Sequence, residues 1–407
     1  MSLAEPVARP TRWGQVALAA LSQNVATGLT FGSFGTLVLA IEREYHADRS
    51  QSSLALSLAV VTLTVTAMLI GRRIDRINLR LVMMAGAALC CAGFALVSVV
   101  NSPAALLATY ALLIGPGTAM AGVLPSMTLA TRWVPETLRG RALGLVNMPI
   151  AVMIVPLAIA PVLLADGPRT VYLLLAAAAA ALIPVLLLVR DGLDGPVAPT
   201  VAPDQTGVPA AITILRRPAF WVLVVAIGFV TGAGTMKLAH FIPLLTGQGR
   251  SFDEANTLLA LQGGSGIFGS LLFGWLADRI GGPRALAINA GIQAVVWTIY
   301  LAPVSLPVLT IDAVIGGACG GGVAGAFGVT VAALFGARAF GRTYSLFQIS
   351  TLPFLFAMTP LASALFQATG SYHLPMGLTV GCLAFAAVLL FALSGKTARE
   401  PLHQAPA

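Results

Sequence analysis

Long apolar runs alternate with short polar interruptions along the whole chain. A hydrocarbon core of about 30 Å is crossed by a helix of roughly 20 apolar residues, so each run predicts one membrane-spanning helix. The longest interruption, residues 190–217, is rich in Pro, Gly and Asp and separates six runs from six. The pattern predicts an all-α membrane protein with an amino-terminal half at 1–189, a linker at 190–217 and a carboxy-terminal half at 218–407. The twelve runs cover residues 15–41, 53–71, 81–100, 104–131, 142–165, 170–189, 218–246, 255–277, 285–302, 306–335, 343–367 and 374–394.

Composition supports the membrane assignment. The 407 residues are 57% hydrophobic and only 9% charged, whereas an average soluble domain is roughly 25% charged. A soluble protein of this composition would expose far too much apolar surface. The net charge of +8 does not indicate nucleic acid, because the arginines are spread over the short interruptions and form no single patch. The four cysteines lie inside apolar runs, without metal-ligand spacing, so we expect neither a disulfide framework nor a metal site.

The basic residues predict the orientation of the chain in the membrane. With a cytoplasmic amino terminus, 18 of the 23 Arg and Lys residues fall on the inside and one, Lys237, falls within a helix. Only Arg43, Arg49, Arg169 and Arg250 then fall outside. Cytoplasmic loops of membrane proteins carry such an excess of positive charge. We therefore expect a multi-pass protein of the cell membrane with both termini in the cytoplasm.

The two halves resemble each other in sequence. The segment Gly71-Arg-Arg-Ile-Asp75-Arg76 follows the second run, and Gly274-Trp-Leu-Ala-Asp278-Arg279 follows the eighth, 203 residues later. The segment RGRALGL at 139–145 is matched more weakly by FGRTYSL at 340–346. Paired six-helix repeats are typical of secondary transporters, which bind substrate between the repeats near the middle of the membrane.

With this G-x-x-x-D-R loop at two equivalent positions and twelve predicted helices, the chain resembles the major facilitator superfamily. The resemblance implies that Asp75, Arg76, Asp278 and Arg279 hold cytoplasmic helix ends together and act in gating between inward-open and outward-open states. Anchoring of the loops by positive charge alone would explain the arginines but not two aspartates at matching positions.

A finer resemblance is to the bacterial branch of the monocarboxylate transporter family. It is carried by TFGSFGTLVLAIEREY at 30–45, ATRWVPETLRGRALGL at 130–145 and LFGARAFGRTYSL at 334–346. The segment 240–279, from the seventh apolar run to the eighth, carries it as well. The resemblance implies a proton-coupled symport of small organic acids. The charged residues of that family are missing here: Ser270 stands where many members have a substrate-binding arginine, Gly266 at its acidic partner, and Gly32 near the helix 1 lysine of animal members.

One lysine lies well inside a predicted helix. An ionised lysine at a helix centre costs roughly 2.5–3.5 kcal/mol on insertion scales, so Lys237 should face a cavity or a partner. Asp312 and His240 are the other titratable side chains well inside predicted helices, and in the superfamily the helices that carry Lys237 and Asp312 line the substrate cavity. At 1.5 Å per residue, Lys237 lies about 15 Å and Asp312 about 8 Å from the outer helix ends. His240, three residues after Lys237, shares its helix face.

Three interpretations of this cluster are open. In the one we favour, Lys237 is the counter-ion of a substrate carboxylate, and Asp312 or His240 carries the coupled proton. In the second, Lys237 pairs permanently with Asp312 and holds the carboxy-terminal half together. In the third, Lys237 extends toward the membrane surface and His240 bonds a backbone carbonyl.

Further cavity candidates carry little charge. Asn24 and Phe31 share one face of helix 1, Asn147 interrupts helix 5, and Gln262 lies among glycines of helix 8. Each lone amide fits an interhelical hydrogen bond as well as a substrate contact. The glycine-rich run at 316–328 lies inside an apolar helix, which favours close helix packing over phosphate binding. Such walls suit a compact, largely apolar acid, including an aromatic one.

We therefore predict a secondary active transporter that moves a small organic anion by alternating access, with proton coupling, as a monomer and without a cofactor. The alternative within transport is an exporter of a neutral or weakly acidic lipophilic compound. A sensor built on a transporter fold is a further class, for which an appended cytoplasmic domain would be expected. An enzyme is not predicted, because the sequence offers no paired carboxylates, no metal-spaced His or Cys cluster, and no complete phosphate-binding loop.

Overall fold

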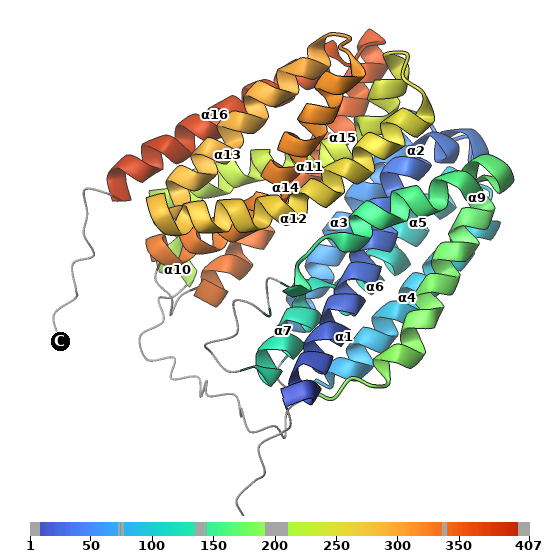
Figure 1. The fold of residues 1–407 in the computed structure, drawn as a ribbon, viewed down its shortest axis with the longest axis horizontal. Coiled ribbons are helices and arrows are strands. Elements are labelled where there is room, and N and C mark those ends of the chain that lie inside the picture. Colours follow the sequence, from blue (N-terminus) through green and yellow to red (C-terminus); the bar gives the residue numbers. More distant parts are fainter. Residues whose placement is uncertain are drawn as a thin grey trace, which may run out of the picture. The chain divides into compact units, whose positions relative to one another are not determined.

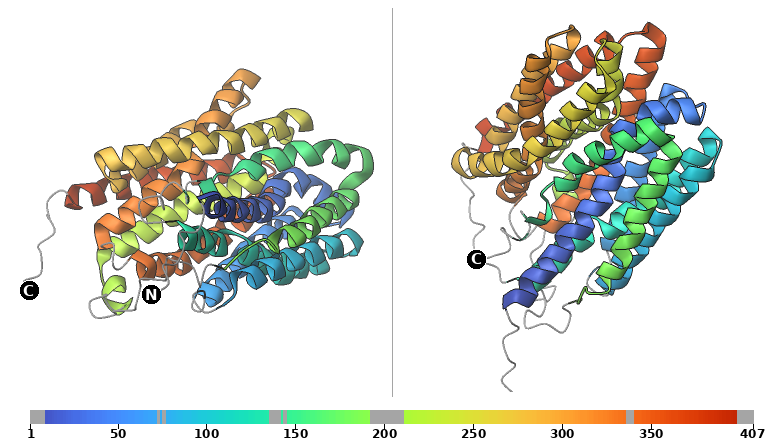
Figure 2. Two further views of the ribbon diagram at one scale, coloured as in Figure 1. Left: turned by 60° about the horizontal axis from the view of Figure 1, so that its bottom comes forward. Right: turned by 45° about the vertical axis from the view of Figure 1, so that its right-hand side comes forward.

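The computed structural model describes residues 9–71, 74, 77–134, 142, 145–191, 211–335 and 340–397, and the described chain is helical with no strand (Figure 1). Helices of the first half lie side by side as a bundle in two further views (Figure 2). The elements of the first half are α1 (Arg9–Thr27), the π-helix η1 (Gly28–Gly32), α2 (Ser33–Glu44), α3 (Arg49–Gly71), α4 (Leu79–Val99), α5 (Pro103–Thr109), the π-helix η2 (Tyr110–Ile114), α6 (Gly115–Ala121), α7 (Val123–Trp133) and α9 (Ile150–Leu186). Those of the second half are α10 (Ala211–Leu215), α11 (Pro218–Gly247), α12 (Phe252–Ile280), α13 (Gly282–Val296), the 3₁₀ helix η3 (Trp297–Leu301), α14 (Leu306–Phe335), α15 (Phe340–Thr369) and α16 (His373–Thr397).

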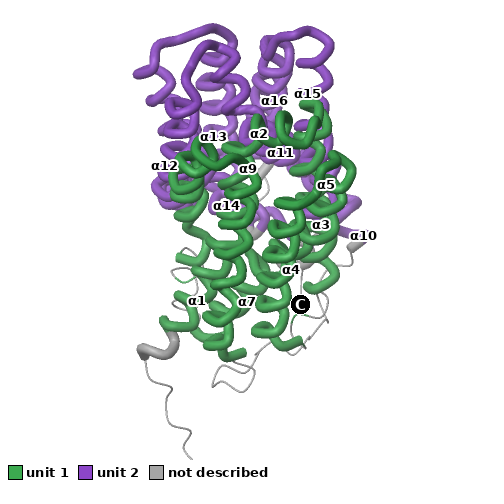
Figure 3. Tube along the Cα trace, turned by 90° about the vertical axis from the view of Figure 1, so that its right-hand side faces the viewer, with its two compact units in different colours: residues 1–205 green, residues 206–407 purple. Residues whose placement is uncertain are grey.

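The chain packs into two compact units, residues 1–205 and 206–407 (Figure 3). Each unit has its own buried core of Leu, Val, Ile, Ala and aromatic side chains. Most of the segment 190–217, which the sequence predicts as a linker, lies outside the described residues.

Eleven helical segments among the described residues are long and apolar enough to cross a membrane. The sequence predicts twelve, and the difference lies in α9, which joins the predicted runs 142–165 and 170–189. Gly167 interrupts this helix with φ 79° and ψ 178°, a backbone conformation open to glycine because it has no Cβ. The chain reverses its direction there (Figure 1), so α9 consists of two helices and accounts for both predicted spans.

Glycines bring α12 and α14 together in the second unit. A Cβ on Gly317 would overlap the Gln262 carbonyl oxygen, and one on Gly321 would overlap that of Gly266. A Cβ on Gly269, on the facing helix, would likewise overlap Ala318. Small residues allow helix backbones to approach closely in membranes. The close packing predicted for the glycine-rich run is thus confirmed, and it holds the two helices that carry Gln262 and Asp312 in fixed register.

We expect Gly321→Ala to lower the melting temperature of the purified protein, because its methyl group would have to push α12 away. The expected cost is about 1–3 kcal/mol, typical of overpacking. Gly320→Ala is the matched control, since no atom lies within 4 Å of a Cβ at that neighbouring position. Equal melting temperatures for the two variants would contradict this account of the helix pair.

Candidate functional site

Lys237 and Asp312 meet in the interior of the second unit. Lys237 lies on α11 and Asp312 on α14, and their side chains are 4% and 0% exposed. The Lys237 Nζ atom is 3.5 Å from Asp312 Oδ2, at the long end of the hydrogen-bond range. Burial removes the water that would otherwise solvate both charges, so the stability of this ion pair depends on the protein groups around it.

Three aromatic rings surround the Lys237 ammonium. Its Nζ atom is 4.7 Å from the ring centroid of Trp297, 4.8 Å from that of Tyr300 and 5.4 Å from that of Phe241. Aromatic faces attract a cation within about 6 Å, and more strongly when water is excluded. We call Phe241, Trp297 and Tyr300 the aromatic cage.

The cage is shaped by a change of helix type. The sequence predicts one helix over 285–302, but α13 ends at Val296 and the chain continues as the 3₁₀ helix η3. In a 3₁₀ helix, side chains three residues apart lie directly above one another. Trp297 and Tyr300 have this spacing, so both rings face Lys237. An α-helix would leave the two side chains roughly 60° apart around its axis, so the 3₁₀ turn aligns them more closely.

The two oxygens of Asp312 have different surroundings. Oδ2 accepts a hydrogen bond from the Tyr300 hydroxyl and also contacts Lys237. Oδ1 is buried and, among the described residues, has no hydrogen-bond partner. A buried acceptor without a partner costs free energy. The two oxygens thus differ, because Lys237 and Tyr300 both contact Oδ2 and neither bonds Oδ1.

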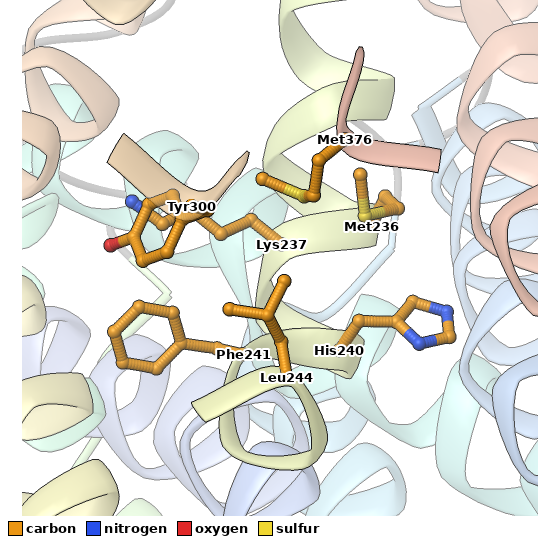
Figure 4. Close-up of a pocket in the computed structure, with 7 residues that line it drawn as sticks. All are labelled: Met236, Lys237, His240, Phe241, Leu244, Tyr300 and Met376. Carbon is orange, nitrogen blue, oxygen red and sulfur yellow. The ribbon is translucent and has the colours of Figure 1, made fainter. Parts of the chain in front are cut away.

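A small cavity lies beside Lys237, and Figure 4 shows the residues that line it. A cavity of about 10 Å³ is lined by Lys237, His240, Phe241, Tyr300 and, at its sides, the three residues Met236, Leu244 and Met376. That volume is close to the minimum that holds one water molecule. In this conformation the site is closed around the ammonium group.

His240 leaves α11 in another direction from Lys237 (Figure 4). Its Nδ1 atom is 3.1 Å from the Tyr372 hydroxyl, and its Nε2 atom is 3.2 Å from both the Thr359 carbonyl oxygen and Ser363 Oγ. A neutral imidazole satisfies these contacts when Nε2–H donates to Thr359 and Nδ1 accepts from Tyr372. His240 thus connects α11 to α15 and to Tyr372, and a shared helix face with Lys237 does not bring the two side chains together.

Gln262 lies close to Lys237. A Cβ built on Gly316 would be 3.1 Å from Lys237 Nζ, 3.7 Å from Gln262 Nε2 and 3.7 Å from Trp297 Nε1. These three nitrogens come from three elements and face the same position on α14. The structure thus places Gln262 beside the Lys237–Asp312 pair, on the helix predicted to carry it.

The amide candidates of the first unit take part in contacts between helices. Asn24 Oδ1 accepts from the Ala151 backbone N–H at 3.1 Å, at the start of α9, and Asn147 accepts from Gln23 at 2.9 Å. This is the interhelical alternative that the sequence left open. Phe31 is partly buried in η1.

Of the predicted gating residues, Asp75 and Arg76 lie outside the described residues. Asp278 and Arg279 are exposed at the end of α12, and the Arg279 guanidinium lies 5.0 Å from the Trp275 ring centroid. Another charged contact lies near the first of these loops: Arg132 pairs with Asp191 and donates to the Ile74 carbonyl oxygen at 2.9 Å.

The sequence analysis did not single out Trp297, Tyr300 or Gly316. A signal was present for Trp297, because it precedes the short loop at 303–305 by about as many residues as Asp312 follows it. Equal distance from a loop on adjacent antiparallel helices means equal depth. Apolar helices contain many aromatic residues, however, so depth alone does not separate a cage from ordinary core packing.

A family model described as Major Facilitator Superfamily matches residues 20–295. The chain is 26% identical over 313 residues to the oxalate:formate antiporter of Oxalobacter formigenes, covering 71% of this chain and 69% of that protein. It is also 26% identical over 254 residues to YcxA of Bacillus subtilis (strain 168), described as an uncharacterized MFS-type transporter, and the match spans 61% of each chain.

Among solved structures, a bacterial homolog of the human lysosomal transporter Spinster, in an inward-facing and unoccupied conformation, superposes with a TM-score of 0.76. The match covers 98% of this chain and 100% of that one at 17% identity, which is evidence for the fold alone. The families and neighbours matched are transporters, not enzymes. Together with the membrane-spanning helices, the family match shows that this chain is a multi-pass transporter that belongs to the Major Facilitator Superfamily.

Proposed function

We propose that the protein is a proton-coupled carrier of a small organic anion, with Lys237 as the counter-ion of the substrate carboxylate and Asp312 as the proton site. The observation that carries the proposal is the buried Lys237–Asp312 contact, enclosed by the aromatic cage. An organic-anion antiporter among the relatives supports the substrate class, and the resemblance to monocarboxylate carriers narrows it to small acids.

Charge balance provides the coupling. The closed site holds one positive and one negative side chain, and His240, which also lines it, has contacts that a neutral ring satisfies. A substrate carboxylate added to this site would leave a net negative charge in a low-dielectric interior, which is costly. If a proton binds Asp312 as the anion binds Lys237, the site stays neutral throughout. Proton and anion are therefore favoured together, and transport by this site carries no net charge.

The cage supports this exchange. When Asp312 is protonated, Lys237 loses its ionic partner until the substrate arrives. The faces of Trp297 and Tyr300 stabilise the ammonium by about 0.5–2 kcal/mol each in that interval. Lys237, held in this way, takes the place of the helix 8 arginine that the resemblance leads one to expect at Ser270.

Asp312 is assigned the proton in preference to His240 because of their partners. The hydrogen bonds of His240 run to the neutral groups of Thr359, Ser363 and Tyr372, and a neutral ring satisfies them. A change in its protonation would break contacts that join α11 to α15, whereas protonation of Asp312 acts on Lys237 through their direct contact.

We accordingly expect His240→Asn to keep its proton-driven accumulation of substrate while losing about 1–3 kcal/mol of stability from the broken hydrogen bonds. The measurement pairs uptake into proteoliposomes with thermal unfolding of the purified variant. If a folded His240→Asn variant lost the gradient dependence of uptake, His240 rather than Asp312 would carry the coupled proton.

Uptake of radiolabelled formate, acetate, lactate and benzoate into proteoliposomes, with and without a proton gradient, tests the proposal. We expect one or more of these acids to accumulate only when the gradient is present, and to the same extent when the membrane potential is clamped at zero. Accumulation of none of them would contradict the proposal and favour export of a neutral lipophilic compound.

A further inference from the structure

We propose that one oxygen of the substrate carboxylate binds beside Gly316, where it accepts hydrogen bonds from Trp297 Nε1–H and the Gln262 amide as well as from Lys237. The inference rests on the proposed function and assigns the carboxylate its position, its donors and its size limit. In this arrangement Gly316 determines which substrates fit. Trp297 binds the carboxylate through its N–H group and also belongs to the aromatic cage.

The geometry at Gly316 is unusual for an apolar helix. The three atoms nearest to a Cβ at this position are all nitrogens: Lys237 Nζ at 3.1 Å, Gln262 Nε2 at 3.7 Å and Trp297 Nε1 at 3.7 Å. The ammonium and the indole nitrogen act only as donors, and the amide nitrogen donates as well. A position faced by three donors from α11, α12 and η3 matches an anionic oxygen in charge and in hydrogen bonding.

Trp297 gives the independent evidence. Its side chain is 1% exposed, and among the described residues its Nε1–H group has no hydrogen-bond partner. Buried indole N–H groups are usually paired, because leaving a donor unpaired costs free energy. The cation–π contact of the ring with Lys237 uses its face and leaves the N–H unsatisfied. A bound carboxylate oxygen would satisfy it.

The lack of a side chain at Gly316 keeps this space open. Other glycines of α14 are explained by helix packing, since a Cβ on Gly317 or Gly321 would meet the backbone of α12. At Gly316 the Cβ would instead meet the donors themselves, at a distance from Nζ that is tighter than most Cβ contacts. A methyl group there would crowd the three donors and hinder the approach of a carboxylate oxygen to them.

The test combines binding measurements with a spectrum of the indole groups. The chain has five tryptophans, so ¹⁵N-indole labelling of the full-length protein in detergent gives few signals, and Trp297→Phe assigns the one of interest. Formate and benzoate are the probes, at a pH low enough for proton-coupled binding. Trp221→Phe is the control for the indole, because that exposed residue donates to the Leu215 carbonyl oxygen. Gly320→Ala, one turn from Gly316, is the control for the methyl group.

We expect the Trp297 indole proton signal to move downfield as either acid binds to the wild type, while the other four stay in place. Trp297→Phe should weaken binding by about 10-fold or more, the loss typical of a hydrogen bond to a charged group. Gly316→Ala should weaken it at least as much, and both control variants should bind as the wild type does.

Two failures are distinguishable. Binding that needs Lys237 but leaves the Trp297 signal unmoved, and that survives Trp297→Phe and Gly316→Ala, would overturn this inference alone. Absence of binding in the wild type, or binding that survives Lys237→Met, would overturn the proposed function and the inference with it.

Discussion

Proteoliposomes that contain the Lys237→Met variant are expected to show no accumulation of organic acid at any proton gradient. Methionine keeps much of the length and apolar volume of lysine but has no charge to receive a carboxylate. Truncating one partner of a buried charge pair costs about 2–5 kcal/mol, so we expect transport efficiency to fall at least about 30-fold. The measurement is the initial rate of uptake at several substrate concentrations.

The single variant also leaves Asp312 buried without its ionic partner, which destabilises a protein by about 3–5 kcal/mol. The double variant Lys237→Met/Asp312→Asn removes both charges and should regain most of that stability. Transport should remain absent in the double variant, because the anion site is still missing. Recovery of transport together with stability would show that the pair only holds the second unit together.

The second large effect is expected for Asp312→Asn. Asparagine keeps the side-chain shape and an oxygen for the Tyr300 hydroxyl but cannot carry a proton. Lys237 would then exchange one anion for another without proton movement. We expect gradient-driven accumulation to fall to background while exchange of labelled for unlabelled acid persists.

Asp253→Asn is the control for this variant, since Asp253 is an exposed carboxylate in the first turn of α12. It should leave both accumulation and exchange unchanged. Gradient-driven accumulation that persists in Asp312→Asn would place the coupled proton on another group.

The helices could be predicted from the sequence because their lengths follow from the thickness of the membrane. The two helices within α9 also correspond to two separate apolar runs. They meet at Gly167, whose non-helical backbone marks the boundary between them. The Lys237–Asp312 contact could be proposed for a similar reason: charged side chains are rare inside membranes, and those that occur need a partner.

The surroundings of the pair could not be predicted in the same way. The aromatic cage is shaped by the change from α13 to η3, which aligns Trp297 and Tyr300 more closely than an α-helix would. This is a local adjustment, without a hydrophobic pattern to mark it. The role of Gly316 is visible only after packing has brought α11, α12 and η3 against α14, because in sequence it is one glycine among many. The direction of the His240 side chain likewise follows from its hydrogen bonds to Thr359 and Tyr372 rather than from its spacing.

The most direct test of the account is to count the protons that bind with the anion. Purified protein in a weakly buffered solution with a pH indicator is mixed with formate or benzoate, and proton uptake is compared with the amount of acid bound. The account predicts about one proton taken up for each anion bound to the wild type, and none for Asp312→Asn. Binding of the anion by the wild type without proton uptake would contradict it.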